Sequence, residues 1–216
     1  MKAKRRKPRS RSRRGRFIVL EGPDGAGKTT QLKLLEKRLR QHGIKTRTVR
    51  EPGGTVAGEK IRKVLLGGKA DHLNAVAETF LFQAARAQLV DQVIRPALER
   101  GEWVLTDRYW LSTLIYQGHV GGVAPAEVKR LSRLATGGLM PDRYIVLWVS
   151  LKEALARRAD RAADRMESKG DAYARKVNLT YRKLARASRD LKLIDNHGTV
   201  EDVAGEVWAL VEPLLP

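Results

Sequence analysis

The sequence contains no cysteine, and its acidic residues are heavily outnumbered by basic ones. Without cysteine the chain has no disulfides, no thiolate metal ligands and no cysteine nucleophile. No apolar run is as long as a membrane-spanning helix, and the N-terminus lacks the apolar stretch of a signal peptide. We therefore expect a cytoplasmic protein, and its 216 residues are enough for one domain with a sizeable core.

The basic excess is concentrated at the N-terminus. The formal net charge is +19, and residues 2–16 hold ten Lys and Arg and no acidic residue. Because this stretch has almost no apolar side chains, we expect residues 1–15 to form a disordered basic tail. Its charge favours weak contact with nucleic acid or anionic surfaces. A solvated arm without a selected partner remains an alternative.

A phosphate-binding motif follows the tail, in the stretch FIVLEGPDGAGKTT at residues 17–30. Apolar residues 17–20 predict a short buried strand, and the residues after the motif predict a helix. The pattern G-x-x-x-x-G-K-[ST] runs from Gly22 to Thr29. Its glycines let backbone N–H groups wrap a phosphate, Lys28 can reach the β- and γ-phosphates, and the threonine hydroxyl can bind Mg²⁺.

The rest of the chain alternates between strand and helix patterns. Further strands are expected at residues 44–49, 103–106, 144–149 and 191–194. Helices are expected at residues 28–42, 56–66, 74–100 (kinked at Pro96), 111–117, 125–135, 151–189 (broken near residues 168–170) and 199–215. This alternation predicts an α/β fold, with a five-stranded parallel sheet flanked by helices in a single domain over residues 16–216. Its active site should lie at the C-terminal ends of the strands.

Several polar side chains follow the predicted strands. Arg50 and Arg108 could grip a second phosphate beside the first, because guanidinium groups donate in a rigid fork and stay charged. Asp107 could serve near Mg²⁺. Surface salt bridges, or an ion pair between Asp107 and Arg108, are the alternatives. Phe82 and Arg86 share a helix face and could stack on a base and donate to its edge, or could be core and surface residues.

These residues stand in motifs that resemble the thymidylate kinase family, whose members transfer the γ-phosphoryl group of ATP to dTMP. The motifs are E-G-P-D-G-A-G-K-T-T (21–30), R-E-P-G-G-T (50–55), F-Q-A-A-R-A-Q (82–88), D-R-Y-W-L-S-T-L-I-Y-Q-G (107–118) and D-R-M-E (164–167). The phosphate loop is shared by many families, but its combination with the second and fourth motifs is specific to this one. The resemblance implies a P-loop nucleoside monophosphate kinase fold with a mobile helical lid at about residues 157–170.

The resemblance also implies roles on the donor side. ATP and its phosphates would be bound by Gly22, Pro23, Asp24, Gly25, Ala26, Gly27, Lys28, Thr29 and Thr30. Mg²⁺ would be the cofactor, held by Thr29 and Asp107. The catalytic residues would be Lys28, Asp107, Arg108 and a lid arginine, with Arg161 and Arg165 as unranked candidates and Arg157 and Arg158 equally open.

On the acceptor side the resemblance implies that dTMP is bound by Asp24, Arg50, Phe82, Arg86, Arg108, Thr113, Tyr116 and Gln117. Phe82 would stack on thymine, Arg86 would donate to a thymine carbonyl, and Tyr116 would disfavour a 2′-hydroxyl. A homodimer is expected from the same resemblance. Two alternatives remain: a kinase for another nucleotide, and a P-loop ATPase that binds nucleic acid through the basic tail.

Overall fold

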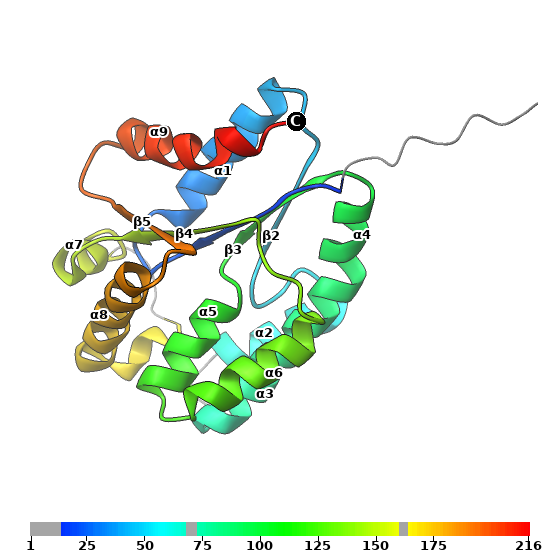
Figure 1. Ribbon diagram of the computed structural model, residues 1–216. Coiled ribbons are helices and arrows are strands. Elements are labelled where there is room, and N and C mark those ends of the chain that lie inside the picture. Colours follow the sequence, from blue (N-terminus) through cyan, green and yellow to red (C-terminus); the bar gives the residue numbers. More distant parts are fainter. Residues whose placement is uncertain (1–13, 68–72, 160–163) are drawn as a thin grey trace, which may run out of the picture.

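The computed structural model describes residues 14–67, 73–159 and 164–216. All but the last two residues of the expected tail lie outside these ranges. Five parallel strands form one sheet in the order β2-β3-β1-β4-β5, which confirms the predicted α/β fold (Figure 1). The strands are β1 Phe17–Glu21, β2 Thr46–Arg50, β3 Trp103–Asp107, β4 Arg143–Trp148 and β5 Leu191–Asp195.

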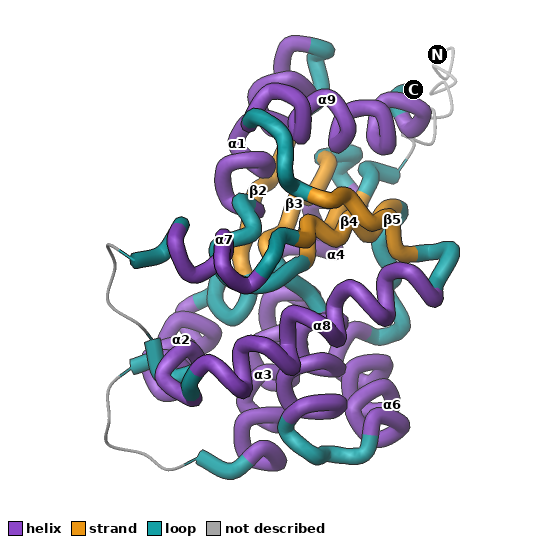
Figure 2. Tube along the Cα trace, turned by 90° about the vertical axis from the view of Figure 1, so that its left-hand side faces the viewer, coloured by secondary structure: helices purple, strands orange, loops and turns teal. Residues whose placement is uncertain are grey.

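Helices cover both faces of the sheet, as Figures 1 and 2 show. They are α1 Lys28–Gln41, α2 Val56–Leu66, α3 Ala75–Leu89, α4 Arg95–Glu99, α5 Trp110–Thr113, α6 Pro125–Thr136, α7 Leu151–Ala156, α8 Asp171–Ala187 and α9 Val200–Val211. Helices α1 and α9 lie on one face, and α3, α4, α6 and α8 lie on the other. In the described part of the chain, no helix is both long enough and apolar enough to cross a bilayer.

Strand β1 separates the two hydrophobic cores. Ile18 and Leu20 pack with Leu39 of α1 on one face, whereas Phe17 and Val19 pack on the other face. Successive side chains of a strand point to opposite faces, so a continuous apolar run is expected where helices cover both. All five residues of β1 are buried, which fixes the strand at the centre of the domain.

The predicted long helix after residue 74 is interrupted by a π-helical segment at Val90–Ile94, directly before α4. Pro96 cannot donate to the carbonyl of Gln92, and a wider turn ahead of a proline accommodates the lost hydrogen bond. A second π-helical segment, Leu114–Val120, continues α5. Such segments are frequent at functional sites, and this one carries two of the predicted site residues.

The prediction of a helical pattern from residue 151 to the break near residue 168 was wrong within the described residues. Helix α7 ends at Ala156, and the next helical residues are a short 3₁₀ turn at Glu167–Lys169. The Asp164 carboxylate accepts from the backbone N–H of Met166 (2.8 Å) and of Glu167 (3.0 Å). Aspartate bonded in this way favours a turn over a continuing helix.

We predict that Leu39→Ala lowers the free energy of unfolding by about 2–5 kcal/mol, because it removes a fully buried side chain and leaves a cavity between α1 and the sheet. The matched control is Leu179→Ala on α8, where the leucine is 57% exposed and the expected loss is under about 0.5 kcal/mol. Urea unfolding of both variants provides the measurement. Equal losses would contradict the assignment of Leu39 to the core.

Candidate active site

The turn between β1 and α1 is a loop whose backbone requires its glycines. Gly22, Gly25 and Gly27 have φ angles of 139°, 83° and 82°, which other residues rarely adopt. A Cβ at Gly22 would stand 2.0 Å from the Leu147 carbonyl oxygen, and one at Gly25 would stand 2.4 Å from that of Ala154. The loop therefore packs too closely on β4 and α7 to accept a side chain at either position.

This loop leads into the N-terminus of α1, where no side chain caps the helix. Lys28 is buried, and its Nζ donates to the carbonyl oxygens of Gly22 (3.0 Å) and Pro23 (2.9 Å). The ammonium group is thus held inside the curve of the loop. A positive helix end and a buried ammonium group at one place make a site for a phosphate.

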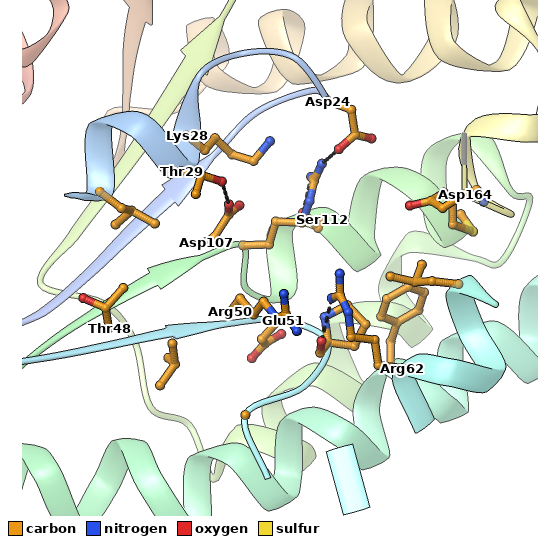
Figure 3. Close-up of a pocket in the computed structure, with 18 of the residues that line it drawn as sticks. Asp24, Lys28, Thr29, Thr48, Arg50, Glu51, Arg62, Asp107, Ser112 and Asp164 are labelled. Carbon is orange, nitrogen blue, oxygen red and sulfur yellow. Dashed lines mark hydrogen bonds and ion pairs between the residues drawn. The ribbon is translucent and has the colours of Figure 1, made fainter. Parts of the chain in front are cut away.

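A hydroxyl and a carboxylate meet beside the loop. The Thr29 hydroxyl donates to Asp107 Oδ2 at 3.0 Å, as the dashed line in Figure 3 shows. The parallel register places Asp107 opposite Leu20 of β1, so the end of β3 lies next to the start of the loop. Hard oxygen ligands of this kind suit Mg²⁺, with phosphate oxygens and water completing the shell. The described residues contain no cluster of three acidic or histidine ligands.

Arg108 joins the phosphate loop to the end of β3. Its Nη2 donates to Asp24 Oδ1 at 2.6 Å, and its Nη1 donates to the Gly22 carbonyl at 3.0 Å. Burial opposes ionisation of Asp24, but the charges of Arg108 and Lys28 outweigh it and hold the pKa of that carboxyl well below its usual value. Arg108 also has a φ of 72°, the one positive φ at a non-glycine position among the described residues. Such a conformation persists where surrounding contacts impose it, often at functional sites.

Two further arginines lie across the pocket from the loop. Figure 3 shows Lys28 and Thr29 on one side, and Arg50 and Arg62 on the other. Arg50 is 61% exposed and pairs loosely with Glu59 at 3.6 Å. Burial and the charge of Arg50 lower the pKa of Arg62. Two guanidinium groups that repel each other beside a cavity favour an anion between them.

The pocket extends from the phosphate loop to α3 and the second π-helical segment. Its volume is about 940 Å³, and the predicted residues Phe82, Thr113, Tyr116 and Gln117 line its far end. Tyr116 donates to Asp24 Oδ2 at 3.2 Å, which ties this end to the loop. The structure thus brings most of the predicted phosphate-side and base-side residues to one cavity.

Arg86 lies behind this wall, with a side chain only 1% exposed. Its Nε donates to Glu51 Oε2 at 2.7 Å, and its Nη2 lies 2.6 Å from the same oxygen in an ion pair. Nη1 donates to Gln83, and Nη2 also donates to the Tyr109 carbonyl and to Thr113 Oγ1. Nη1 carries two protons and has one partner among the described residues, so one N–H of Arg86 is left without a partner there.

Glu51 is buried together with Arg86, and burial raises the pKa of its carboxyl to about 7 against the lowering effect of the arginine. Its second oxygen, Oε1, has no hydrogen-bond partner within the described ranges. The Glu51 carboxyl therefore gains or loses its proton near neutral pH.

The predicted lid arginines are placed as follows. Arg161 lies outside the described residues. Arg165 donates to Glu78 Oε1 (2.9 Å) and to the Leu65 carbonyl (2.7 Å), so its guanidinium is held against α2 and α3. Arg157 donates to the Asn196 carbonyl at 3.2 Å, beside the phosphate loop.

Seven residues that contact the predicted site residues or line the pocket were not predicted from the sequence. They are Glu21, Glu51, Arg62, Glu78, Ser112, Tyr181 and Asn196. Asn196 Nδ2, for example, donates to the Ala26 carbonyl in the loop at 2.8 Å. The acidic residue ending an otherwise apolar β1 was a usable signal for Glu21, but no local pattern marks Arg62 or Tyr181.

Comparison with known proteins agrees with this geometry. The family model described as thymidylate kinase matches residues 20–207. The thymidylate kinase of Symbiobacterium thermophilum is 43% identical over 201 residues, which are 93% of this chain and 94% of the relative. That of Nitrobacter winogradskyi is 42% identical over 94% of this chain and 90% of the relative. The thymidylate kinase of Thermosipho africanus is 40% identical over 91% of this chain and 97% of the relative.

The match covers the phosphate loop, both strand-end arginines, the base-side wall and the segment carrying Arg165. Such identity over nearly the whole chain exceeds what a shared fold alone would produce. The chain belongs to the thymidylate kinase family.

Proposed function

We propose that this chain transfers the γ-phosphoryl group of ATP to dTMP, giving dTDP and ADP, as a step in dTTP biosynthesis. The observation that carries the proposal is the single cavity in which a glycine-rich phosphate loop faces Arg50, Arg62 and Arg108. One polyphosphate and one monophosphate can lie there side by side. Phe82 at the far end offers an aromatic face for the base of the acceptor.

On the donor side, Gly22 to Thr30 cradle the ATP phosphates through backbone N–H groups and Lys28. Thr29 and Asp107 would hold Mg²⁺, which supplies charge neutralisation at the β- and γ-phosphates. On the acceptor side, Arg50 and Arg108 bind the 5′-phosphate of dTMP, with Asp24 beside the sugar and phosphate.

The base-side residues read thymine. Phe82 stacks on the ring, the free N–H of Arg86 donates to a thymine carbonyl, and Thr113 and Gln117 complete the edge. Tyr116 disfavours a 2′-hydroxyl on the sugar. Support comes from the positions of Phe82, Thr113, Tyr116 and Gln117 around one end of the cavity, and from the hydrogen bond by which Glu51 holds Arg86 directly behind them.

The mechanism follows from charge. An oxygen of the dTMP phosphate is already anionic, so it attacks the γ-phosphorus without a strong general base. The new O–P bond forms as the bond to the β–γ bridging oxygen breaks, and ADP leaves with that electron pair. Lys28 and Arg108 hold the two reacting groups in line and oppose their mutual repulsion. We expect a lid arginine to add positive charge there, and Arg157, Arg158, Arg161 and Arg165 remain candidates.

We further propose a homodimer, a weak contact of the basic tail with nucleic acid, and a cytoplasmic location. A homodimer is supported by exposed apolar side chains on adjacent helices, Val64 on α2 and Val76 and Phe80 on α3. Weak contact of the basic tail with nucleic acid is supported only by its charge. A cytoplasmic location, where ATP is abundant, completes the proposal.

A panel of monophosphates tests the substrate. In a coupled assay of ADP formation with ATP and Mg²⁺, we expect dTMP to be used best. We expect dUMP about tenfold less well for lack of the methyl group, and dCMP and dGMP at least about 100-fold less well because their edges mismatch Thr113 and Arg86. Preference for another monophosphate would replace dTMP in the proposal. Polynucleotide-stimulated ATP hydrolysis without a phosphorylated nucleotide would instead favour the ATPase alternative.

Lys28→Ala should lower kcat by about 10²–10³-fold, because its charge is needed most as the γ-phosphoryl group transfers. The dissociation constant of dTMP should change by less than about threefold. The control is Lys37→Ala, an exposed lysine further along α1, which should leave both quantities near wild type. Steady-state kinetics and calorimetric titration with dTMP measure the two effects. Comparable losses in kcat and in dTMP binding would contradict the assignment.

The Glu51–Arg86 pair predicts a pH dependence of stability. The pKa of Glu51 is about 7 in the folded protein against 4.5 for an unperturbed glutamate. Between about pH 5 and 7 the folded protein therefore keeps a proton that the unfolded chain has released. The free energy of unfolding should fall by about 3 kcal/mol as pH rises through this window.

Glu51→Gln should remove that decline, which urea unfolding at pH 5, 6, 7 and 8 would measure. Glu59→Gln is the matched control in the same region. The pKa of Glu59 is lowered by a hydrogen bond from the Gly54 N–H, so the residue is ionised throughout the window and its loss should leave the wild-type decline in place. An unchanged decline in Glu51→Gln would show that another group causes it.

A further inference from the structure

Behind Arg108 lies a buried hydrogen-bond cluster that the proposed mechanism does not use. Glu21, the last residue of β1, has no exposed surface. Its Oε1 accepts from the backbone N–H of Tyr109 (2.7 Å) and of Ser112 (3.2 Å). Its Oε2 accepts from the Ser112 hydroxyl (2.6 Å) and from the Tyr181 hydroxyl (2.9 Å). Three separate elements, β1, α5 and α8, thus meet at one carboxylate.

The carboxylate decides which way the two hydroxyl groups point. An ionised carboxylate only accepts hydrogen bonds, so the protons of Ser112 and Tyr181 are both directed at Glu21. The two hydroxyl oxygens lie 2.8 Å apart. Since both protons are engaged by Glu21, these oxygens present lone pairs on their other side.

That other side faces Arg108. Its Nη1 lies 3.0 Å from Ser112 Oγ and 2.9 Å from Tyr181 Oη, and it also donates to the Gly22 carbonyl. Burial and the charge of Glu21 keep the pKa of Tyr181 far above its ordinary value, so the hydroxyl stays protonated and keeps this orientation.

The remaining edges of the guanidinium face the cavity. Nη2 lies against Asp24 and Tyr116, and Nε has no hydrogen-bond partner among the residues described. Figure 3 shows Asp24 and Ser112 on either side of the guanidinium that the dashed line joins to Asp24. The guanidinium is therefore held at Nη1 and, through Asp24, at Nη2, and its Nε is the donor that the described residues leave without a partner.

We propose that Glu21 and Tyr181 are positioning residues that hold the Arg108 guanidinium in the orientation needed to grip the phosphate of the acceptor nucleotide. The proposal rests on the proposed role of Arg108. Tyr181 is the informative member, because it stands on α8, far along the chain from β1 and β3. Helix α8 also supplies Tyr173, whose hydroxyl donates to the Tyr116 carbonyl at 3.0 Å, so this helix supports two acceptor-side residues.

The test compares two tyrosine-to-phenylalanine variants of the full chain. Tyr181→Phe removes a hydroxyl that Arg108 uses. Tyr144→Phe removes a buried hydroxyl for which the described residues offer no partner. Calorimetric titration with dTMP and with thymidine, which lacks the phosphate, separates phosphate binding from base and sugar binding.

For Tyr181→Phe we expect the dissociation constant of dTMP to rise about tenfold while that of thymidine changes less than about twofold, because only the phosphate contact loses its geometry. For Tyr144→Phe we expect both constants to match wild type. The KM for ATP should stay within about twofold of wild type in both variants. Equal weakening of dTMP and thymidine in Tyr181→Phe, or no weakening of either, would overturn the proposal.

Two more variants keep the result interpretable. Glu21→Gln replaces one acceptor oxygen by a donor and forces a hydroxyl to turn, so we expect the same loss confined to dTMP; an equal loss for thymidine would overturn the proposal. Arg108→Lys keeps the positive charge but removes the paired N–H donors of the guanidinium, so it tests whether Arg108 binds the acceptor phosphate. If Arg108→Lys binds dTMP like wild type, the acceptor role of Arg108 fails. If it weakens dTMP while Tyr181→Phe does not, only the positioning proposal fails.

Discussion

Arg108 donates to Asp24 and to the Gly22 carbonyl, and through these bonds the end of β3 is tied to the phosphate loop that follows β1. Both strands run parallel at the centre of the sheet, so their C-terminal ends lie side by side. A donor phosphate and an acceptor phosphate repel each other, and bringing them together needs fixed positive charge between them. The rest of the site supports that one arrangement.

Buried carboxylates recur behind the groups that face the cavity. Glu21 orients the hydroxyls that hold Arg108, and Glu51 holds Arg86. Glu78 accepts from Gln117 Nε2 at 2.9 Å and pairs with Arg165. Burying a carboxylate costs free energy unless it is paired or hydrogen-bonded. Each of these three carboxylates binds a cation or a polar group and fixes the orientation of that group. The side chains that these carboxylates bind, Arg86, Arg165 and the hydroxyls beside Arg108, are therefore fixed by contacts within the protein itself.

Glu78 also links the segment after residue 164 to the acceptor side. Besides Arg165, it pairs with Lys169 at 2.6 Å, and the Arg165 backbone N–H donates to the Leu66 carbonyl. In this conformation the segment contacts α2 and α3, the helices that also carry Arg62 and Phe82. Residues that the family resemblance assigns to the donor side are thus bonded to the acceptor side, which gives the two halves of the pocket a physical connection.

The sequence by itself determined the features that depend on neighbours along the chain. The glycine spacing of residues 22–27, the apolar run of β1 and the positions of Arg50 and Arg108 at the ends of their strands are local patterns. These patterns correctly predicted the sheet and the edge where the pocket lies. Only the tertiary structure decided which distant groups meet. Tyr181 reaches Glu21 across 160 positions and Arg165 reaches Glu78 across 87. Strand register and helix packing determine which distant residues meet, and neither can be predicted from the spacing of nearby residues.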